Sequence, residues 1–173
     1  QLKLGSALNQ DTTLGPMVSV RSANFAREQI KQALEQGAIS HIDEQDFPLS
    51  KEGSCYLAPH ILSNVNHDMA IMSEESFAPV VGIMKVKNDE DALAHINDSQ
   101  YGLTASIWTQ DENAMLALAN DIETGTVFMN RCDYLDPALA WVGVKDSGRG
   151  CALSYLGFAQ VTRPKSIHIR EAS

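Results

Sequence analysis

The sequence predicts an α/β fold, an open and mostly parallel sheet whose strands are joined by crossover helices. From residue 80 to residue 130, short apolar stretches alternate with stretches whose apolar residues have helical spacing. Residues 80–86 form an almost continuous apolar run, which suits a buried strand. A strand, helix, strand, helix, strand order implies parallel pairing through crossover helices.

One clear helix is expected in the first half of the chain. Its apolar face recurs at steps of three and four residues and consists of Ala23, Ala26, Ile30, Ala33 and Leu34. Gly37 is placed to end this helix. A short strand and a loop are expected over residues 38–54, and an edge or irregular strand over 56–62 because Pro59 has no N–H to donate to a sheet.

Two more helices are expected in the second half. Asp89 or Asp91 can cap the first of them, and Asp111 opens the second, which Gly125 ends. The remaining expected elements are strands over 105–108 and 125–130, a long loop over 131–150, a helix over 152–161 and an alternating, half-buried strand over 165–170.

Composition limits the kinds of partner. With 173 residues, 44% hydrophobic and 20% charged, the chain is expected to fold around one real core. A formal net charge of −9 argues against binding to nucleic acid or to an anionic membrane, because contacts to phosphate need clustered Lys and Arg. No stretch approaches the length of a membrane span, and no signal peptide is visible.

The three cysteines, Cys55, Cys132 and Cys151, are odd in number and lack Cys-x-x-Cys spacing. They are typical of reduced thiols in a cytoplasmic protein. The five histidines show no metal-ligand spacing with Cys or acidic residues, so no metal site is expected. The chain starts at Gln1 and not at Met, which suggests processing or a piece of a longer protein.

The stretch Ser73–Val80 reads Ser-Glu-Glu-Ser-Phe-Ala-Pro-Val. It closely resembles the Glu-Glu-x-Phe-Gly-Pro-Val signature of the NAD(P)-dependent aldehyde dehydrogenases, in which the second Glu holds the nicotinamide ribose and the Phe lies against the nicotinamide. A carboxylate suits this role because it can accept a charge-assisted hydrogen bond from each ribose hydroxyl. The resemblance implies that Glu75 and Phe77 bind NAD or NADP; alone, these residues also fit an exposed acidic pair followed by a core Phe.

Further motifs resemble the same family, in order, over nearly the whole chain. They are the turns at 4–8 and 13–17, the helix end at 33–38, the Tyr-x-x-Pro-Thr-like strand at 56–60, the Asn-x-x-x-Tyr-Gly-Leu segment at 97–108, the strand at 125–130 and the Gly-x-Lys-x-Ser-Gly-x-Gly turn at 143–150. There are two departures: Ala78 replaces a usual Gly, and Cys151-Ala152 replaces a frequent Arg-Glu. If the turn needs a positive φ at Ala78, its geometry must shift.

The resemblance also implies a division of the chain and of the site. Residues 1–163 resemble the C-terminal part of the catalytic domain, and 164–173 a terminal oligomerisation strand and tail, with Ile167 and Ile169 on an edge that can pair with another subunit or with its own chain. Counting back from Lys145, Leu135 and Trp141 fall in the aldehyde pocket, where an apolar wall excludes water; for Trp141 the alternative is core packing. Arg131, Asp133 and Asp136 in the same loop can tune substrate preference.

The sequence lacks the Gly-Gln-x-Cys context of the family's nucleophile and the Glu-Leu-Gly-Gly context of its general base. The resemblance places both, with the Rossmann-type domain, upstream of the matched region. This chain alone is therefore expected to be inactive, to hold no NAD or NADP, and to form a homo-oligomer through exposed apolar surface. The alternatives are a non-catalytic assembly module on the same scaffold, or a flavodoxin-like binding protein, which would need a phosphate-binding loop that is not found.

Overall fold

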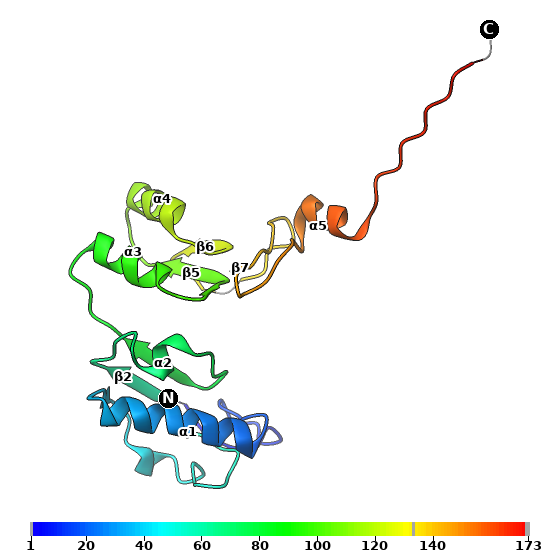
Figure 1. Ribbon diagram of the computed structural model, residues 1–173. Coiled ribbons are helices and arrows are strands. Elements are labelled where there is room, and N and C mark those ends of the chain that lie inside the picture. The colour runs from blue at the N-terminus through cyan, green and yellow to red at the C-terminus, as the bar shows by residue number, and fades with distance from the viewer. Residues whose placement is uncertain (1, 133, 172–173) are drawn as a thin grey trace. The chain divides into compact units, whose positions relative to one another are not determined.

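The computed structural model describes residues 2–132 and 134–171. The chain forms two compact units, Gln1–Val86 and Lys87–Ser173, where one core was expected. Both units combine helices with short strands, so the α/β class predicted from the sequence is confirmed (Figure 1). Each unit has its own sheets and helices and is described by itself.

The first unit contains α1 (Val20–Glu35), β1 (Ile39–Ser40), the short 3₁₀-helix η1 (Glu44–Asp46), β2 (His60–Ser63), α2 (Ala70–Ser73) and β3 (Val80–Ile83). The three strands form one sheet in the order β1-β2-β3. β1 runs antiparallel to β2, and β2 runs parallel to β3, with Leu62 opposite Gly82. The backbone N–H of His60 donates to the carbonyl of Pro79 at 2.9 Å, which extends the pairing to the residue before β3.

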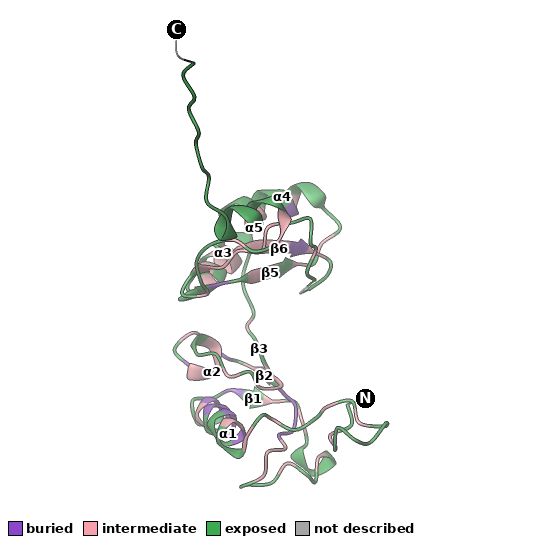
Figure 2. Ribbon diagram, turned by 90° about the vertical axis from the view of Figure 1, so that its right-hand side faces the viewer, coloured by how far each residue is buried: buried purple, intermediate pink, exposed green. Residues whose placement is uncertain are grey.

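Helix α1 forms where the apolar spacing predicts it. The side chain of Ser19 caps it by accepting from the N–H of Ser22, and the chain leaves the helix through Gly37 at φ +102°, which glycine adopts without steric cost. Of the predicted face, all but Leu34 is buried, and Figure 2 shows the buried residues along one side of the helix.

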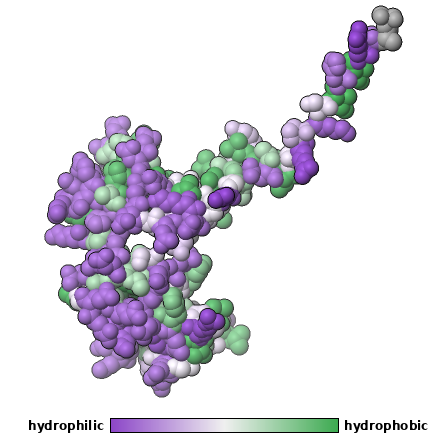
Figure 3. Space-filling view, viewed as in Figure 1, coloured by the Kyte–Doolittle hydropathy of each residue, from purple (hydrophilic) through white to green (hydrophobic). Residues whose placement is uncertain are grey.

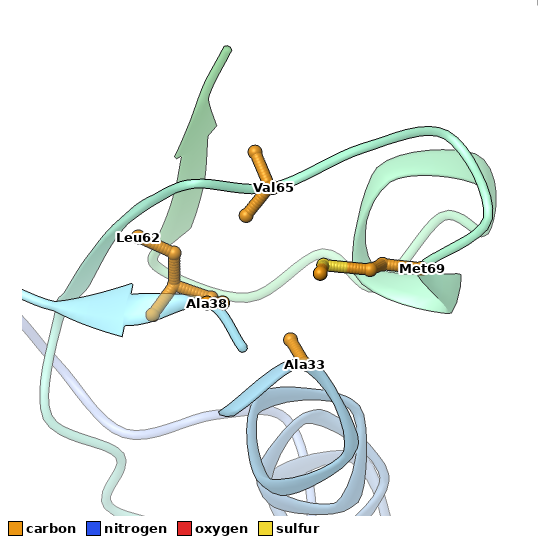
Figure 4. Packing of buried hydrophobic residues seen from close by; sticks show 5 residues of the cluster. All are labelled: Ala33, Ala38, Leu62, Val65 and Met69. Carbon is orange, nitrogen blue, oxygen red and sulfur yellow. The ribbon is translucent and has the colours of Figure 1, made fainter. Parts of the chain in front are cut away.

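The core of this unit lies where α1 meets the sheet and α2. Leu62 is fully buried among Ala33, Ala38, Val65 and Met69 (Figure 4). The two alanines allow the helix and the strand β1 to approach closely, and the larger Leu and Met side chains fill the space between them.

Only one face of the β1-β2-β3 sheet is covered. The other face carries Ile61 (39% exposed), Val81 (52%) and Ile83 (55%). The apolar run at 80–86 correctly indicated a strand, but the strand is buried on one face only. An apolar run does not reveal which of its alternating side chains will find a neighbour.

The second unit contains α3 (Asp89–Asn97), β4 (Tyr101–Gly102), β5 (Thr104–Ile107), α4 (Glu112–Asp121), β6 (Thr126–Met129), β7 (Val144–Lys145) and α5 (Ser154–Val161). β5 and β6 pair in parallel and are joined through α4, as the predicted crossover requires. β4 pairs antiparallel with β7 in a separate two-stranded sheet. The strands of the chain are thus divided among three small sheets.

The helix starts in this unit differ from expectation at one place. Asp111 caps α4 by accepting from the N–H groups of Asn113 and Ala114, as predicted. For α3, however, the cap is Asn88, whose side chain accepts from the N–H of Asp91, so the assignment to Asp89 or Asp91 is wrong. Asn88 has the extended backbone that an N-cap needs, and Asp89 and Asp91 already belong to the helix.

Beyond α5 the described chain continues to residue 171 with no helix or strand. Ile167 and Ile169 are 76% and 81% exposed, and Figure 3 shows hydrophobic and hydrophilic residues interspersed along this segment. The strand expected over 165–170 therefore has no partner among the described residues of its own chain. An isolated strand has no ladder of hydrogen bonds to hold it, so it is not assigned as one.

Candidate functional site

The stretch that carries Glu75 and Phe77 connects α2 to β3 and is fixed at both ends. The N–H of Glu74 donates to the carbonyl of Ala70 at 2.8 Å and ends α2. At the other end Pro79 is bound to β2, and the N–H of Val80 donates to the carbonyl of Ala78 at 2.8 Å. A short exposed segment between two anchored elements presents its side chains outward.

Phe77 has φ +46°, in the left-handed region that non-glycine residues rarely adopt, and its side chain is 88% exposed. The positive φ in this turn is therefore at the Phe. Ala78 does not have one, and it packs against the cluster of Ala26, Ile30 and Leu57. The Gly-to-Ala departure is accommodated for this reason, and the expected disturbance at Ala78 does not occur.

Glu75 and Phe77 line one cleft of about 850 Å³ within the first unit. The cleft lies against the start of α1 and the turn before it, and Leu57 also lines it. The turn is fixed to the unit by a hydrogen bond from the N–H of Met17 to the carbonyl of Cys55 at 2.8 Å. The cleft thus combines a carboxylate with an exposed aromatic ring over an apolar wall.

Arg21 and Phe25 are among the cleft residues that were not anticipated from the sequence. Both lie in the first turns of α1 and project from its exposed side. Arg21 makes no hydrogen bond or ion pair with any residue in the described part of the chain. No local pattern marks these residues, because only the folding of α1 beside residues 75–79 brings them to Glu75.

The expected aldehyde-pocket residues lie in the second unit. Leu135 is 57% exposed in the loop after β6, and Trp141 is partly buried and forms an isolated antiparallel bridge with Ala152 through hydrogen bonds of 2.7 and 2.9 Å. The backbone of Trp141 therefore has a structural partner. Near the start of the loop, the guanidinium of Arg131 lies 3.8 Å from the ring centre of Tyr134, a cation–π contact. Asp133 lies outside the described residues, and Asp136 accepts from the N–H of Ala138.

The glycine-rich turn at 143–150 holds the second unit together. The ammonium of Lys145 donates to the carbonyl of Asn97 at 2.8 Å and pairs with Glu123 at 2.7 Å. The hydroxyl of Ser147 accepts from the N–H of Gly102 at 2.9 Å. The Asn-x-x-x-Tyr-Gly-Leu and Gly-x-Lys-x-Ser segments thus contact each other, which gives these motif residues a structural role.

Among the described residues, no cluster of three or more His, Cys, Asp and Glu side chains could hold a metal ion. No described helix is long and apolar enough to cross a membrane. The three cysteines are free thiols.

Known proteins resemble this chain over most of its length. Residues 1–167 match the model of the aldehyde dehydrogenase family. An aldehyde dehydrogenase of Paenarthrobacter nicotinovorans is 34% identical over 94% of this chain and 35% of its own length. A succinate semialdehyde dehydrogenase [NAD(P)+] of Escherichia coli is 36% identical over 90% of this chain and 33% of its own length. The chain spans about a third of the length of these relatives.

Solved structures of aldehyde dehydrogenases also resemble this chain. A succinic semialdehyde dehydrogenase from Streptococcus pyogenes in complex with NADP+ superposes with a TM-score of 0.87 at 33% identity, covering 98% of this chain and 37% of that one. A betaine aldehyde dehydrogenase from Staphylococcus aureus in complex with NAD+ gives a TM-score of 0.80 at 28% identity, covering 92% and 32%. This chain belongs to the aldehyde dehydrogenase family.

Proposed function

We propose that this chain is the C-terminal part of an NAD(P)-dependent aldehyde dehydrogenase that oxidises an aldehyde to a carboxylic acid. In this proposal residues 1–163 complete the catalytic domain and 164–173 form the assembly strand and tail. The observation that carries it is the shared cleft of Glu75 and Phe77. Because the chain spans about a third of its relatives, the activity is proposed for the longer protein.

Glu75 holds the nicotinamide ribose in this proposal. Its carboxylate is exposed at the cleft and has no hydrogen-bond partner in the described part of the chain, so both oxygens can accept from the two ribose hydroxyls. Phe77 offers a ring face to the nicotinamide, and Arg21 brings a positive charge to a cleft that would receive an anionic dinucleotide. When bound, the nicotinamide would supply the hydride acceptor, and Glu75 and Phe77 would hold and position it.

Leu135 and Trp141 form an apolar wall of the aldehyde pocket in the same proposal. An apolar wall contributes to catalysis by excluding water from the reacting carbon. This sequence contains neither the Gly-Gln-x-Cys context of the family's nucleophile nor the Glu-Leu-Gly-Gly context of its general base. We therefore propose that the chain alone binds no NAD or NADP measurably and turns over no aldehyde.

The cofactor site can be tested in a longer polypeptide that carries this chain behind a Gly-Gln-x-Cys segment. Glu75→Gln is expected to weaken NAD(P) binding about tenfold, since it removes a charge-assisted hydrogen bond. Glu74→Gln is the matched control, because Glu74 is the neighbouring carboxylate and does not line the cleft. The affinity is read from the fluorescence of bound NADH or NADPH. Equal effects of the two variants would refute the assignment.

We further propose that the protein is a cytoplasmic homo-oligomer. Free thiols are typical of a reducing compartment. The exposed aliphatic residues after α5 suit pairing with another subunit's sheet edge. A monomer by light scattering at high concentration contradicts the oligomer.

The alternative is an assembly module without activity. The reading frame upstream of Gln1 distinguishes this module from the enzyme. A frame encoding Gly-Gln-x-Cys and Glu-Leu-Gly-Gly supports the enzyme, whereas a start codon near Gln1 supports the module. Turnover of an aldehyde by this chain with NAD or NADP, above a blank, contradicts the proposed inactivity.

A further inference from the structure

A second hollow of about 730 Å³ lies in the first unit, between α1 and the loop that passes through η1 to β2. Ile30, Leu34 and Leu57 give it an apolar wall. Its charged side chains comprise four carboxylates and two cations: Glu28, Glu35, Glu44 and Glu52, with Arg27 and Lys31. The cofactor site proposed above does not use this hollow.

His60 lines this hollow and is 3% exposed. Its Nδ1 is buried without a hydrogen-bond partner, and its Nε2 is 3.6 Å from Oε1 of Glu44, beyond hydrogen-bond distance. Neither ring nitrogen is hydrogen-bonded to another residue in the described part of the chain. Buried polar atoms normally have partners, so the ring has unused hydrogen-bonding capacity, and Nε2 is the nitrogen that lies toward Glu44.

His60 offers an acceptor at neutral pH. Burial lowers the pKa of its imidazole, and the opposing attraction of the Glu44 carboxylate is the smaller effect. A neutral imidazole has one nitrogen that donates and one that accepts.

The two cations of the hollow are already engaged. The guanidinium of Arg27 donates to the carbonyls of Ser54 at 3.1 Å and Tyr56 at 2.6 Å. The ammonium of Lys31 lies 3.9 Å from Glu35. Glu44 and Glu52 have no Lys or Arg partner among the residues that the structure describes. The field within the hollow therefore favours a positively charged ligand.

We propose that this hollow binds a small organic cation, a primary ammonium on a short aliphatic body. The ammonium has three donors and no acceptor, which matches the carboxylate of Glu44 and the neutral imidazole of His60. The aliphatic body packs on the wall of Ile30, Leu34 and Leu57. An anion would meet unpaired carboxylates, and a neutral alcohol would leave Glu44 without a cation.

The test is a titration of the full chain with n-butylammonium chloride, followed by the ¹⁵N resonances of the His60 ring. The expected result is a saturable shift of those resonances. n-Butanol, which lacks the charge, and tetramethylammonium, which lacks N–H donors, are expected to bind at least about tenfold more weakly, the loss of a charge-assisted hydrogen bond. Equal binding of either control, or an unmoved His60 resonance, overturns the proposal.

Two variants test whether n-butylammonium binds at Glu44. Glu44→Gln is expected to weaken n-butylammonium binding about tenfold, because it removes the charge that faces His60. Glu74→Gln removes one carboxylate outside the hollow and is expected to leave binding unchanged. Glu44 is 62% exposed, so its exchange does not threaten folding. A similar loss of n-butylammonium affinity in both variants would mean that the cation is attracted only by the net charge of the chain, and would refute the site.

Discussion

The packing around Leu62 gives the sharpest test of the described fold. Leu62 is fully buried on β2, whereas its neighbour Ile61 on the same strand is 39% exposed on the opposite face. Leu62→Ala removes three buried carbon groups, worth about 2 to 2.5 kcal/mol in transfer free energy. A residual cavity adds to this, so we expect the free energy of unfolding to fall by about 3 to 4 kcal/mol.

The surroundings of Leu62 decide how far the cavity left by Leu62→Ala can close. Ala33 and Ala38 are too short to fill the space, and Val65 is stiff at its branched Cβ. Met69 in the cluster, and Met72 and Met84 packed against it, have the flexibility to move part of the way into the cavity. Ile61→Ala is the matched control, with an expected cost below about 1 kcal/mol, because its side chain already contacts water.

The assay must report on the first unit. Trp108 and Trp141 both lie beyond residue 86, so tryptophan fluorescence reports on the second unit. Hydrogen exchange of peptides from α1 and β2 in increasing urea measures the unit that contains Leu62. A cost below about 1 kcal/mol for Leu62→Ala, or equal costs for the two variants, would refute the core described here.

Two further outcomes are expected. Burial lowers the pKa of the His60 imidazole in the folded chain, so the unfolded chain binds a proton on this ring more readily. The stability that the neutral ring contributes is therefore present above the pKa of the unfolded chain, and it is lost as pH falls toward the lower pKa of the folded chain. The urea midpoint of the first unit should therefore fall less between pH 7.5 and 5.5 in His60→Gln than in the parent, and an equal fall contradicts it. A Cβ on Gly125 would overlap the backbone carbonyl of Val142, so Gly125→Ala should destabilise the second unit by about 2 kcal/mol or more in urea monitored by tryptophan fluorescence. Gly157→Ala in α5 of the same unit, where an added Cβ would meet its neighbours only at 3.4 Å or more, should not; equal midpoints of the two variants would refute this.

Local patterns predicted the local structure well. The spacing of alanines and Ile30 gave α1, and Asp111 was correctly identified as the cap of α4. These features depend on residues within a few positions of one another. The cap of α3 was misplaced because an Asn and two Asp stand close together there, and only the backbone conformation of Asn88 decides among them.

Long-range features could not be predicted in the same way. The division into three small sheets depends on which strands pair, and β4 finds β7 across more than 40 residues of chain. For the candidate site, the motif identified Glu75 and Phe77, but Arg21 joins them only through the packing of α1. That His60 is buried with an unpaired ring nitrogen likewise cannot be predicted from the sequence, because it depends on which residues pack around the ring.

The left-handed backbone at Phe77 has a consequence for which substitutions this position accepts. Asn and Gly occupy that conformation with less steric cost than Phe, and β-branched residues occupy it with more. Conformational preference and the proposed contact with the nicotinamide therefore favour different residues at position 77. Selection for thermal stability alone would favour Asn or Gly at position 77, whereas selection for the proposed cofactor contact would favour Phe.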